Sequence, residues 1–262
     1  MSAFELSKWY ADCVGDEGDA VILYHAELRL GILPIHYESL LIRERDSPAR
    51  AEYSLRRNSA PVARDGSVEW QSSHWRASAS WRDLGRPQRE VLFEAGAGSL
   101  QWNCIAPRAA ATVRIGEEKP LKGWGYVEHL KLSIPPWRLP IRRLRWGRFV
   151  NAADSLVWID WSGPSARQVV VLNGARAPAA RITDSDVVLD ASGATLHLED
   201  SQEIRNGRLG ETALAVFPNL SDLFPESILN IRECKWLSRA TLRQPGRPDS
   251  TGTAIHEVVE WP

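Results

Sequence analysis

The stretch best suited to chemistry in this sequence is Lys122–Leu132, which we predict to be a β-strand entered through two glycines. Side chains alternate between the two faces of a strand, so Trp124, Tyr126 and Glu128 share one face. A carboxyl group enclosed by aromatic rings holds its proton to higher pH and can act as a general acid near neutrality. Such an acid could protonate an isolated double bond, and the rings would stabilise the resulting cation.

Two ordinary explanations of the same strand stay open. If the face that carries Glu128 meets water, the strand is simply amphipathic and has no enclosed acid. If the face is buried, Glu128 could instead form a structural ion pair with an arginine such as Arg148. A catalytic role for Glu128 therefore requires first that its carboxylate be buried.

A second carboxylate beside an aromatic ring lies in the predicted strand 155–163. Trp158 and Asp160 share a face of this strand, which is otherwise apolar. Asp160 is therefore a further candidate for proton transfer. It could also cap the turn that precedes Gly163.

The patterns of several other active sites are missing from the sequence. It contains no Gly-x-Ser-x-Gly elbow and no Gly-x-Gly-x-x-Gly loop. Its histidines show no His-Glu-x-x-His spacing, so we expect no metal, although a barrel could gather distant histidines. The histidines are His25, His36, His74, His129, His197 and His256.

Short β-rich runs separated by Gly, Pro, Asn and Asp turns extend along the chain, and no long segment has the 3.6-residue period of a helix. This pattern predicts about fourteen to seventeen short strands in an antiparallel all-β fold, a barrel or a sandwich. One strand is expected at 211–217, and 225–232 could form a short helix. Three prolines within 133–140 disfavour a strand interior, so we predict two β domains, 1–132 and 133–262.

Composition narrows the class of protein. The chain of 262 residues carries 32 basic and 33 acidic residues, which disfavours a nucleic-acid partner. It has no apolar run of about 18 residues and no signal-peptide pattern, and its three cysteines form no disulfide pattern. We therefore expect a cytoplasmic protein without stable membrane insertion. The 12 tryptophans could either plug barrel ends or line a cavity for an apolar ligand.

Several of these residues together resemble the lipocalin-like carotenoid hydratase family, which is more distantly similar to tocopherol cyclases. The motifs are sparse but cover most of the chain. They are Lys8-Trp9-Tyr10-x-Asp12, Ile22-Leu23-Tyr24, Gly123-x-Gly125-Tyr126-x-Glu128, Trp146-Gly147-Arg148, Trp158-x-Asp160-Trp161 and Lys235-Trp236. The resemblance implies two lipocalin-like antiparallel β-barrel or sandwich domains packed together, few short helices, a ligand in a deep cavity, and no cofactor.

The resemblance also implies roles for particular residues. The family's site combines a His-x-Trp pair with a later Tyr-x-Asp pair, and Trp102 and Tyr126 have that kind of spacing. Glu128 stands at the position of the acid, whereas Leu100 stands at the position of the histidine. Because a water-orienting base is missing, the pattern suits cyclisation or isomerisation better than hydration.

We therefore expect a cofactor-independent enzyme that acts on a large hydrophobic substrate of the terpenoid or polyketide kind, by acid-catalysed cyclisation, isomerisation or hydration of a double bond. Two alternatives are a non-catalytic lipocalin-like carrier and a pericyclase of the Diels-Alder type that shapes its substrate. The expected catalytic residues are Glu128, Tyr126 and Asp160. The residues expected to contact the substrate are Trp102, Trp124, Trp158, Asn103, Trp9 and Tyr24.

Overall fold

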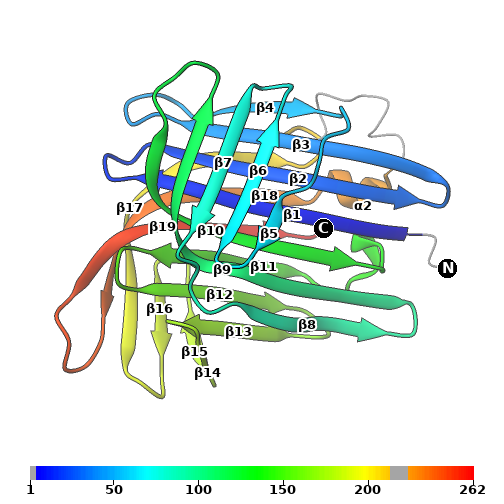
Figure 1. The fold of residues 1–262 in the computed structure, drawn as a ribbon. Helices are drawn as coiled ribbons and strands as arrows, with labels where there is room; N and C mark the ends of the chain where they lie inside the picture. The colour runs from blue at the N-terminus through cyan, green and yellow to red at the C-terminus, as the bar shows by residue number, and fades with distance from the viewer. Residues whose placement is uncertain (1–3, 213–223) are drawn as a thin grey trace. The chain divides into compact units, whose positions relative to one another are not determined.

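A computed structural model describes residues 4–212 and 224–262, and these residues confirm the all-β fold. They form two antiparallel sheets, one of ten strands and one of nine (Figure 1). The chain divides into two compact units, Met1–Pro136 and Trp137–Pro262, whereas the sequence suggested a division after Leu132. None of the helices in the described part of the chain is long and apolar enough to cross a membrane.

The first unit contains the ten-stranded sheet, whose order is β4-β3-β2-β1-β10-β9-β7-β6-β5, with β8 paired to β9. The strands are β1 (Phe4–Gly15), β2 (Ala20–Leu30), β3 (Leu33–Arg43), β4 (Arg50–Ser54), β5 (Val62–Arg64), β6 (Ser67–Ser72), β7 (Ala77–Arg82), β8 (Gln88–Ala95), β9 (Gly98–Ile115) and β10 (Leu121–Leu132). The predicted acid strand is therefore β10, which lies between β1 and β9.

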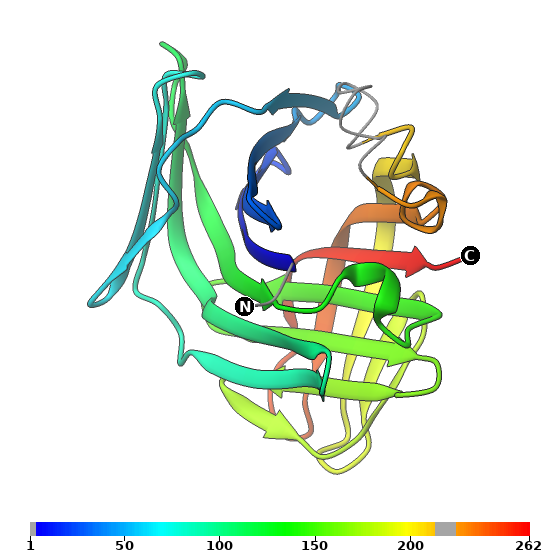
Figure 2. The same ribbon diagram turned by 90° about the vertical axis from the view of Figure 1, so that its right-hand side faces the viewer.

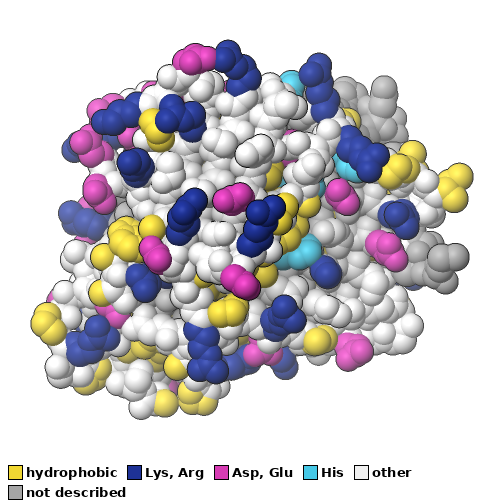
Figure 3. All heavy atoms as spheres, viewed as in Figure 1, with side chains coloured by type: hydrophobic (Ala, Val, Ile, Leu, Met, Phe, Trp, Pro, Cys, Tyr) yellow, Lys and Arg dark blue, Asp and Glu magenta, His cyan; other side chains and the backbone are white. Residues whose placement is uncertain are grey.

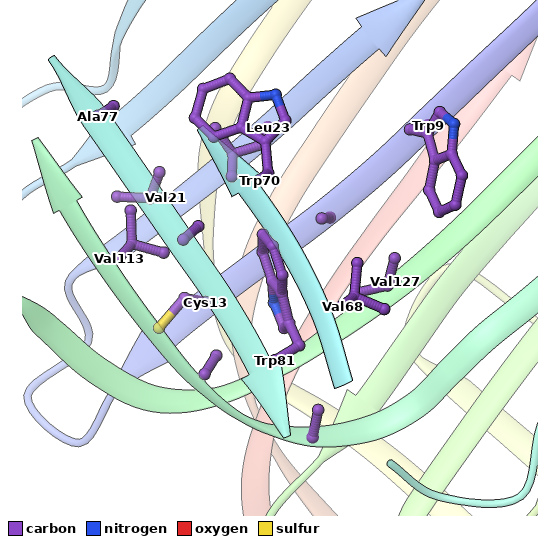
Figure 4. Packing of buried hydrophobic residues seen from close by; sticks show 14 of the residues in the cluster. Trp9, Cys13, Val21, Leu23, Val68, Trp70, Ala77, Trp81, Val113 and Val127 are labelled. Carbon is purple, nitrogen blue, oxygen red and sulfur yellow. The ribbon is translucent and has the colours of Figure 1, made fainter. Parts of the chain in front are cut away.

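This sheet curls around a hydrophobic core. Leu40 of β3 and Val68 of β6 belong to the same buried cluster, although β2, β1, β10, β9 and β7 lie between their strands. The curvature of these blue to green strands can be followed in Figure 2. Trp9, Trp70 and Trp81 belong to the cluster, as Figure 4 shows, so several tryptophans of this unit fill the barrel.

Two glycines of β10 let it approach β1 closely. A Cβ atom at Gly123 would lie 1.9 Å from the Val14 carbonyl oxygen, and one at Gly125 would lie 2.1 Å from the Asp12 carbonyl oxygen. Real Cβ atoms do not approach backbone oxygens so closely, so any larger residue would push the two strands apart. The glycines that mark the start of the predicted strand therefore fix the spacing between β1 and the strand that carries Glu128.

The second unit contains the nine-stranded sheet, whose order is β14-β13-β12-β11-β19-β18-β17-β16-β15. The strands are β11 (Arg143–Val150), β12 (Ser155–Ser162), β13 (Arg167–Leu172), β14 (Ala175–Ala177), β15 (Ala180–Ile182), β16 (Asp186–Leu189), β17 (Ala194–Arg208), β18 (Arg232–Arg243) and β19 (Ser250–Glu260). A 3₁₀ turn, η1 (Pro136–Arg138), occupies the proline-rich segment, and the predicted short helix is α2 (Glu226–Leu229). Most of the strand expected at 211–217 lies outside the described residues.

The second sheet also curls around its own core. Val170 of β13 and Val187 of β16 share one buried cluster with Trp158, although their strands stand near opposite ends of the sheet order. The Gln168 side-chain oxygen accepts a hydrogen bond from the Ala180 backbone N–H (2.9 Å), which ties β13 to the terminal strand β15.

On the face of the molecule in Figure 3, basic and acidic side chains are interspersed, as the balanced composition suggests.

Replacing Gly123 by alanine should destabilise the first unit, because the added methyl group would overlap the Val14 carbonyl. We expect the free energy of unfolding to fall by about 2 kcal/mol, the usual scale of overpacking in a core. Urea unfolding followed by tryptophan fluorescence measures this change. Gly96→Ala is the matched control, because a Cβ atom at Gly96 would meet nothing within 4 Å. Equal stability of the two variants would show that β1 and β10 need no such close approach.

Candidate active site

The centre of the candidate site is the Glu128 carboxylate, whose Oε2 accepts two hydrogen bonds. The Trp102 indole N–H donates at 2.6 Å, and the Tyr126 hydroxyl donates at 2.7 Å. Glu128 is only 5% exposed, and both donors are fully buried. The carboxylate therefore does not face bulk water, and the structure brings together three of the residues singled out in the sequence.

Strand pairing explains how these three side chains meet. Tyr126 and Glu128 are two residues apart on β10 and so share a face. In the pairing of β10 with β9, Glu128 lies opposite Cys104 and Leu130 lies opposite Trp102, so Trp102 is the diagonal neighbour of Glu128. A long indole can span such a diagonal. The register shifts around Val127, and this irregularity sets which β9 residues stand beside the acid.

The two polar neighbours of Glu128 are held in their neutral forms. Burial raises the pKa of the Tyr126 hydroxyl well above its ordinary value, and the nearby Cys104 and Glu128 raise it further. Burial likewise raises the pKa of the Cys104 thiol, against the opposing effect of its hydrogen bond with Tyr126. Tyr126 is therefore a phenol at neutral pH, and as a phenol it can donate to the carboxylate.

A second buried carboxylate lies on the neighbouring strand, and sequence reasoning gave it no role. Tyr10 stands opposite Glu128 in the pairing of β1 with β10. Its hydroxyl donates to Asp12 Oδ2 at 3.0 Å, and Asp12 is fully buried. The alternation of Tyr10 and Asp12 along β1 was a usable signal, because it repeats the pattern of Tyr126 and Glu128 along β10.

Three tyrosine rings continue this face across the sheet. The Tyr10 ring packs edge-on against Tyr126 (centroids 6.0 Å apart) and against Tyr24 (5.3 Å). The Lys8 ammonium lies 5.0 Å from the centroid of the Tyr24 ring. The predicted contact residue Tyr24 therefore belongs to the same aromatic wall as Tyr126. We call Trp102, Tyr126, Glu128, Tyr10, Asp12 and Tyr24 the acid–aromatic cluster.

Other predicted residues of the first unit lie elsewhere. Trp9 points to the core face of the sheet, where it stacks on His129 (centroids 4.3 Å apart). The Asn103 amide donates to the His129 carbonyl oxygen at 3.1 Å. Trp124 stands further along β10, with the Arg108 guanidinium 5.5 Å from its ring centroid. The structure therefore places none of these three with Glu128.

Trp158 and Asp160 belong to the second unit. Trp158 is part of its hydrophobic core, and its ring occupies the space that a side chain at position 147 would need. Asp160 Oδ1 accepts a hydrogen bond from the Gln168 amide (3.1 Å), which links β12 to β13. Arg148 also lies in this unit, where its guanidinium donates to the Thr253 carbonyl oxygen at 3.0 Å.

Among the residues described, no group of three or more His, Cys, Asp or Glu side chains could hold a metal ion.

Comparison with known proteins gives a likeness in fold. No protein-family model and no curated protein matches the chain. The solved structure of CghA is 14% identical, covers 99% of this chain and 89% of its own, and has a TM-score of 0.57. The structure of CghA with Sch210972 is 12% identical, covers 98% of this chain and 88% of its own, and has a TM-score of 0.55. Kievitone hydratase from Nectria haematococca is 10% identical, covers 97% of this chain and 88% of its own, and has a TM-score of 0.56. At these identities the likeness establishes the fold.

Removing either donor to Glu128 should destabilise the fold, because the buried carboxyl group would lose a hydrogen-bond donor. We expect Trp102→Phe and Tyr126→Phe each to lower the free energy of unfolding by about 1–3 kcal/mol. Trp124→Phe is the control, since it removes an indole N–H from the same strand face at a distance from the acid. Chemical denaturation would contradict the account if all three variants lost the same stability.

His129 should make the stability of the protein sensitive to acid. Burial lowers its pKa from 6.5 to about 4, and the positive charge of Lys131 contributes. The His129 imidazole binds a proton more readily in the unfolded chain than in the folded protein. The stabilisation that its neutral form contributes is therefore fully present above pH 6.5 and is lost as the pH falls towards 4. His129→Phe should therefore weaken the pH dependence of the unfolding free energy in that window, by up to about 1.4 kcal/mol per pH unit.

Thermal unfolding between pH 4 and pH 7 measures this dependence. His74→Phe is the control, because it removes an exposed imidazole rather than one stacked on Trp9. A His129→Phe variant that lost stability with acid as steeply as the parent would contradict the assignment.

Proposed function

We propose that this protein is a cofactor-independent enzyme that protonates a double bond of a large hydrophobic substrate, with Glu128 as the general acid. The observation that carries the proposal is the pair of hydrogen bonds from Trp102 and Tyr126 to one oxygen of a buried carboxyl group. Both donors bind Oε2, so a proton on this group would sit on Oε1. A protonated carboxyl can keep both hydrogen bonds while its O–H points elsewhere.

The same two donors help after the proton has left. Hydrogen bonds to a carboxylate are stronger than those to a neutral carboxyl, so the stabilisation from Trp102 and Tyr126 grows as Glu128 gives up its proton. Preorganised donors aimed at developing negative charge are a main source of catalytic power. The aromatic wall of Tyr126, Tyr10 and Tyr24 offers ring faces and edges to a carbocation, and the Asp12 carboxyl group, which accepts the Tyr10 hydrogen bond, lies on the same side of the sheet.

The proposed substrate class rests on the types of side chain around the acid. Aromatic rings dominate the acid–aromatic cluster, which suits a polyene of the terpenoid or polyketide kind. Quenching of the cation by the substrate itself would give cyclisation or isomerisation, and quenching by water would give hydration. The fold likeness to a protein named as a hydratase and to CghA, which was solved with Sch210972, supports an enzyme of small molecules.

The test is turnover of a panel of linear polyenes by the wild type and by Glu128→Gln. We expect the rate to fall by at least about 100-fold, the usual contribution of a general acid. Glu52→Gln is the matched control, because Glu52 is an exposed carboxylate paired with Arg50 (2.9 Å). Circular dichroism confirms that each variant is folded.

Two outcomes would replace the proposal by one of the alternatives. Unchanged turnover in Glu128→Gln, together with loss of turnover in Trp102→Ala, would indicate a pericyclase that needs the wall and not the acid. Saturable quenching of tryptophan fluorescence by the same polyenes, without product, would indicate a carrier.

A further inference from the structure

The core face of the first sheet carries a buried histidine–carboxylate pair that the proposed function does not use. His25 of β2 stands opposite Glu38 of β3, and its Nδ1 lies 3.0 Å from Glu38 Oε1. The Asn58 amide donates to the same oxygen at 2.9 Å and also to the Gln71 carbonyl oxygen. His25 and Glu38 are 3% and 1% exposed. The pair is therefore fixed from two sides inside the barrel.

His25 borders a small cavity in this barrel. The cavity has a volume of about 10 Å³, and its wall includes Trp9, Leu23, Pro61, Trp70 and Trp81. A space of this size holds roughly one water molecule. Leu23, Trp70 and Trp81 can be located in Figure 4.

Two residues that line this cavity each carry a buried polar atom that is unsatisfied. Among the described residues, His25 Nε2 and the Trp70 indole N–H have no hydrogen-bond partner. Trp81 differs, because its indole N–H donates to the Asp12 carbonyl oxygen at 2.7 Å. Buried polar groups without protein partners are commonly satisfied by a bound molecule. His25 Nε2 also lies 3.7 Å from Glu27 Oε1, a separation too long for a direct bond and suited to a bridging oxygen.

The chemistry of the two atoms selects the ligand. A carboxylate only accepts hydrogen bonds, so Glu38 fixes the His25 tautomer with the proton on Nδ1 and leaves a lone pair on Nε2. The Trp70 indole can only donate. A group that donates to one atom and accepts from the other is a hydroxyl.

We propose that this cavity is a second binding site, which holds one hydroxyl group between His25 Nε2 as acceptor and the Trp70 indole N–H as donor. The hydroxyl belongs either to a water molecule or to a small alcohol. The site lies on the opposite face of the sheet from Glu128, since Val127 packs in the barrel core while Glu128 bonds to Trp102. Tyr24 lines the cavity and also belongs to the acid–aromatic cluster, but Glu128 does not line the cavity.

Nuclear magnetic resonance of the full ¹⁵N-labelled chain tests the proposal. We expect a cross-relaxation signal between water and the Trp70 indole proton, assigned by its loss in Trp70→Phe, and a His25 ring protonated on Nδ1 alone. In His25→Leu the water signal at Trp70 should disappear. Trp75→Phe is the matched control. The Trp75 and Trp70 ring centroids are 6.4 Å apart, but Trp75 is not among the residues that line the cavity. This variant should keep the signal.

Titration with methanol separates the two sources of the hydroxyl. A saturable shift of the Trp70 indole signal that is lost in His25→Leu identifies a small alcohol as a ligand, and a water signal without such a shift identifies water. Glu38→Gln adds an independent readout, because its amide can donate to Nδ1 and should move the His25 proton to Nε2. The proposal is overturned if the wild type shows neither a water signal nor a methanol shift at Trp70, or if its His25 carries the ring proton on Nε2.

Discussion

A carboxylate buried in a protein must find hydrogen-bond donors, and here an indole and a phenol supply them to one oxygen of Glu128. The candidate site depends on this arrangement. Burial of Trp102 and Tyr126 keeps them in place, and burial of Tyr126 keeps its hydroxyl protonated and able to donate. The acid is therefore held in one orientation before any substrate arrives, which is the condition for efficient proton transfer.

The first sheet separates two kinds of interior. One face packs an apolar cluster around Trp81 and contains the His25–Glu38 pair, whereas the other carries the acid–aromatic cluster. The glycines of β10 make this possible, because they let β1 approach β10 so that Tyr10 stands directly opposite Glu128. A sheet with both faces buried can thus combine a rigid core with a reactive wall.

Alternation along the strands could be predicted from the sequence, and it correctly placed Tyr126 with Glu128 and turned His129 to the opposite face. The strand character of the chain, the short helix near Glu226 and the absence of long helices in the described part were also accessible from local patterns. The contact of Trp102 with the acid was suggested only by resemblance, because the register shift at Val127 that sets it leaves no mark in the sequence.

Other features needed the structure because they depend on which strands become neighbours. Alternation along β1 separates Trp9 from Tyr10, but only the pairing of β1 with β10 shows that Trp9 stacks on His129 and that Tyr10 joins the acid–aromatic cluster. The pairing of β2 with β3 brings His25 opposite Glu38 across a hairpin, and this contact was likewise not predicted from the sequence.

The most direct test of the central claim is the fate of a proton on carbon. A polyene turned over by the protein in D₂O should yield a product that carries deuterium at the protonated carbon, because an acid such as Glu128 exchanges its proton with solvent. A product formed at the same rate without deuterium on carbon would show that no proton is delivered, and the acid role of Glu128 would be wrong.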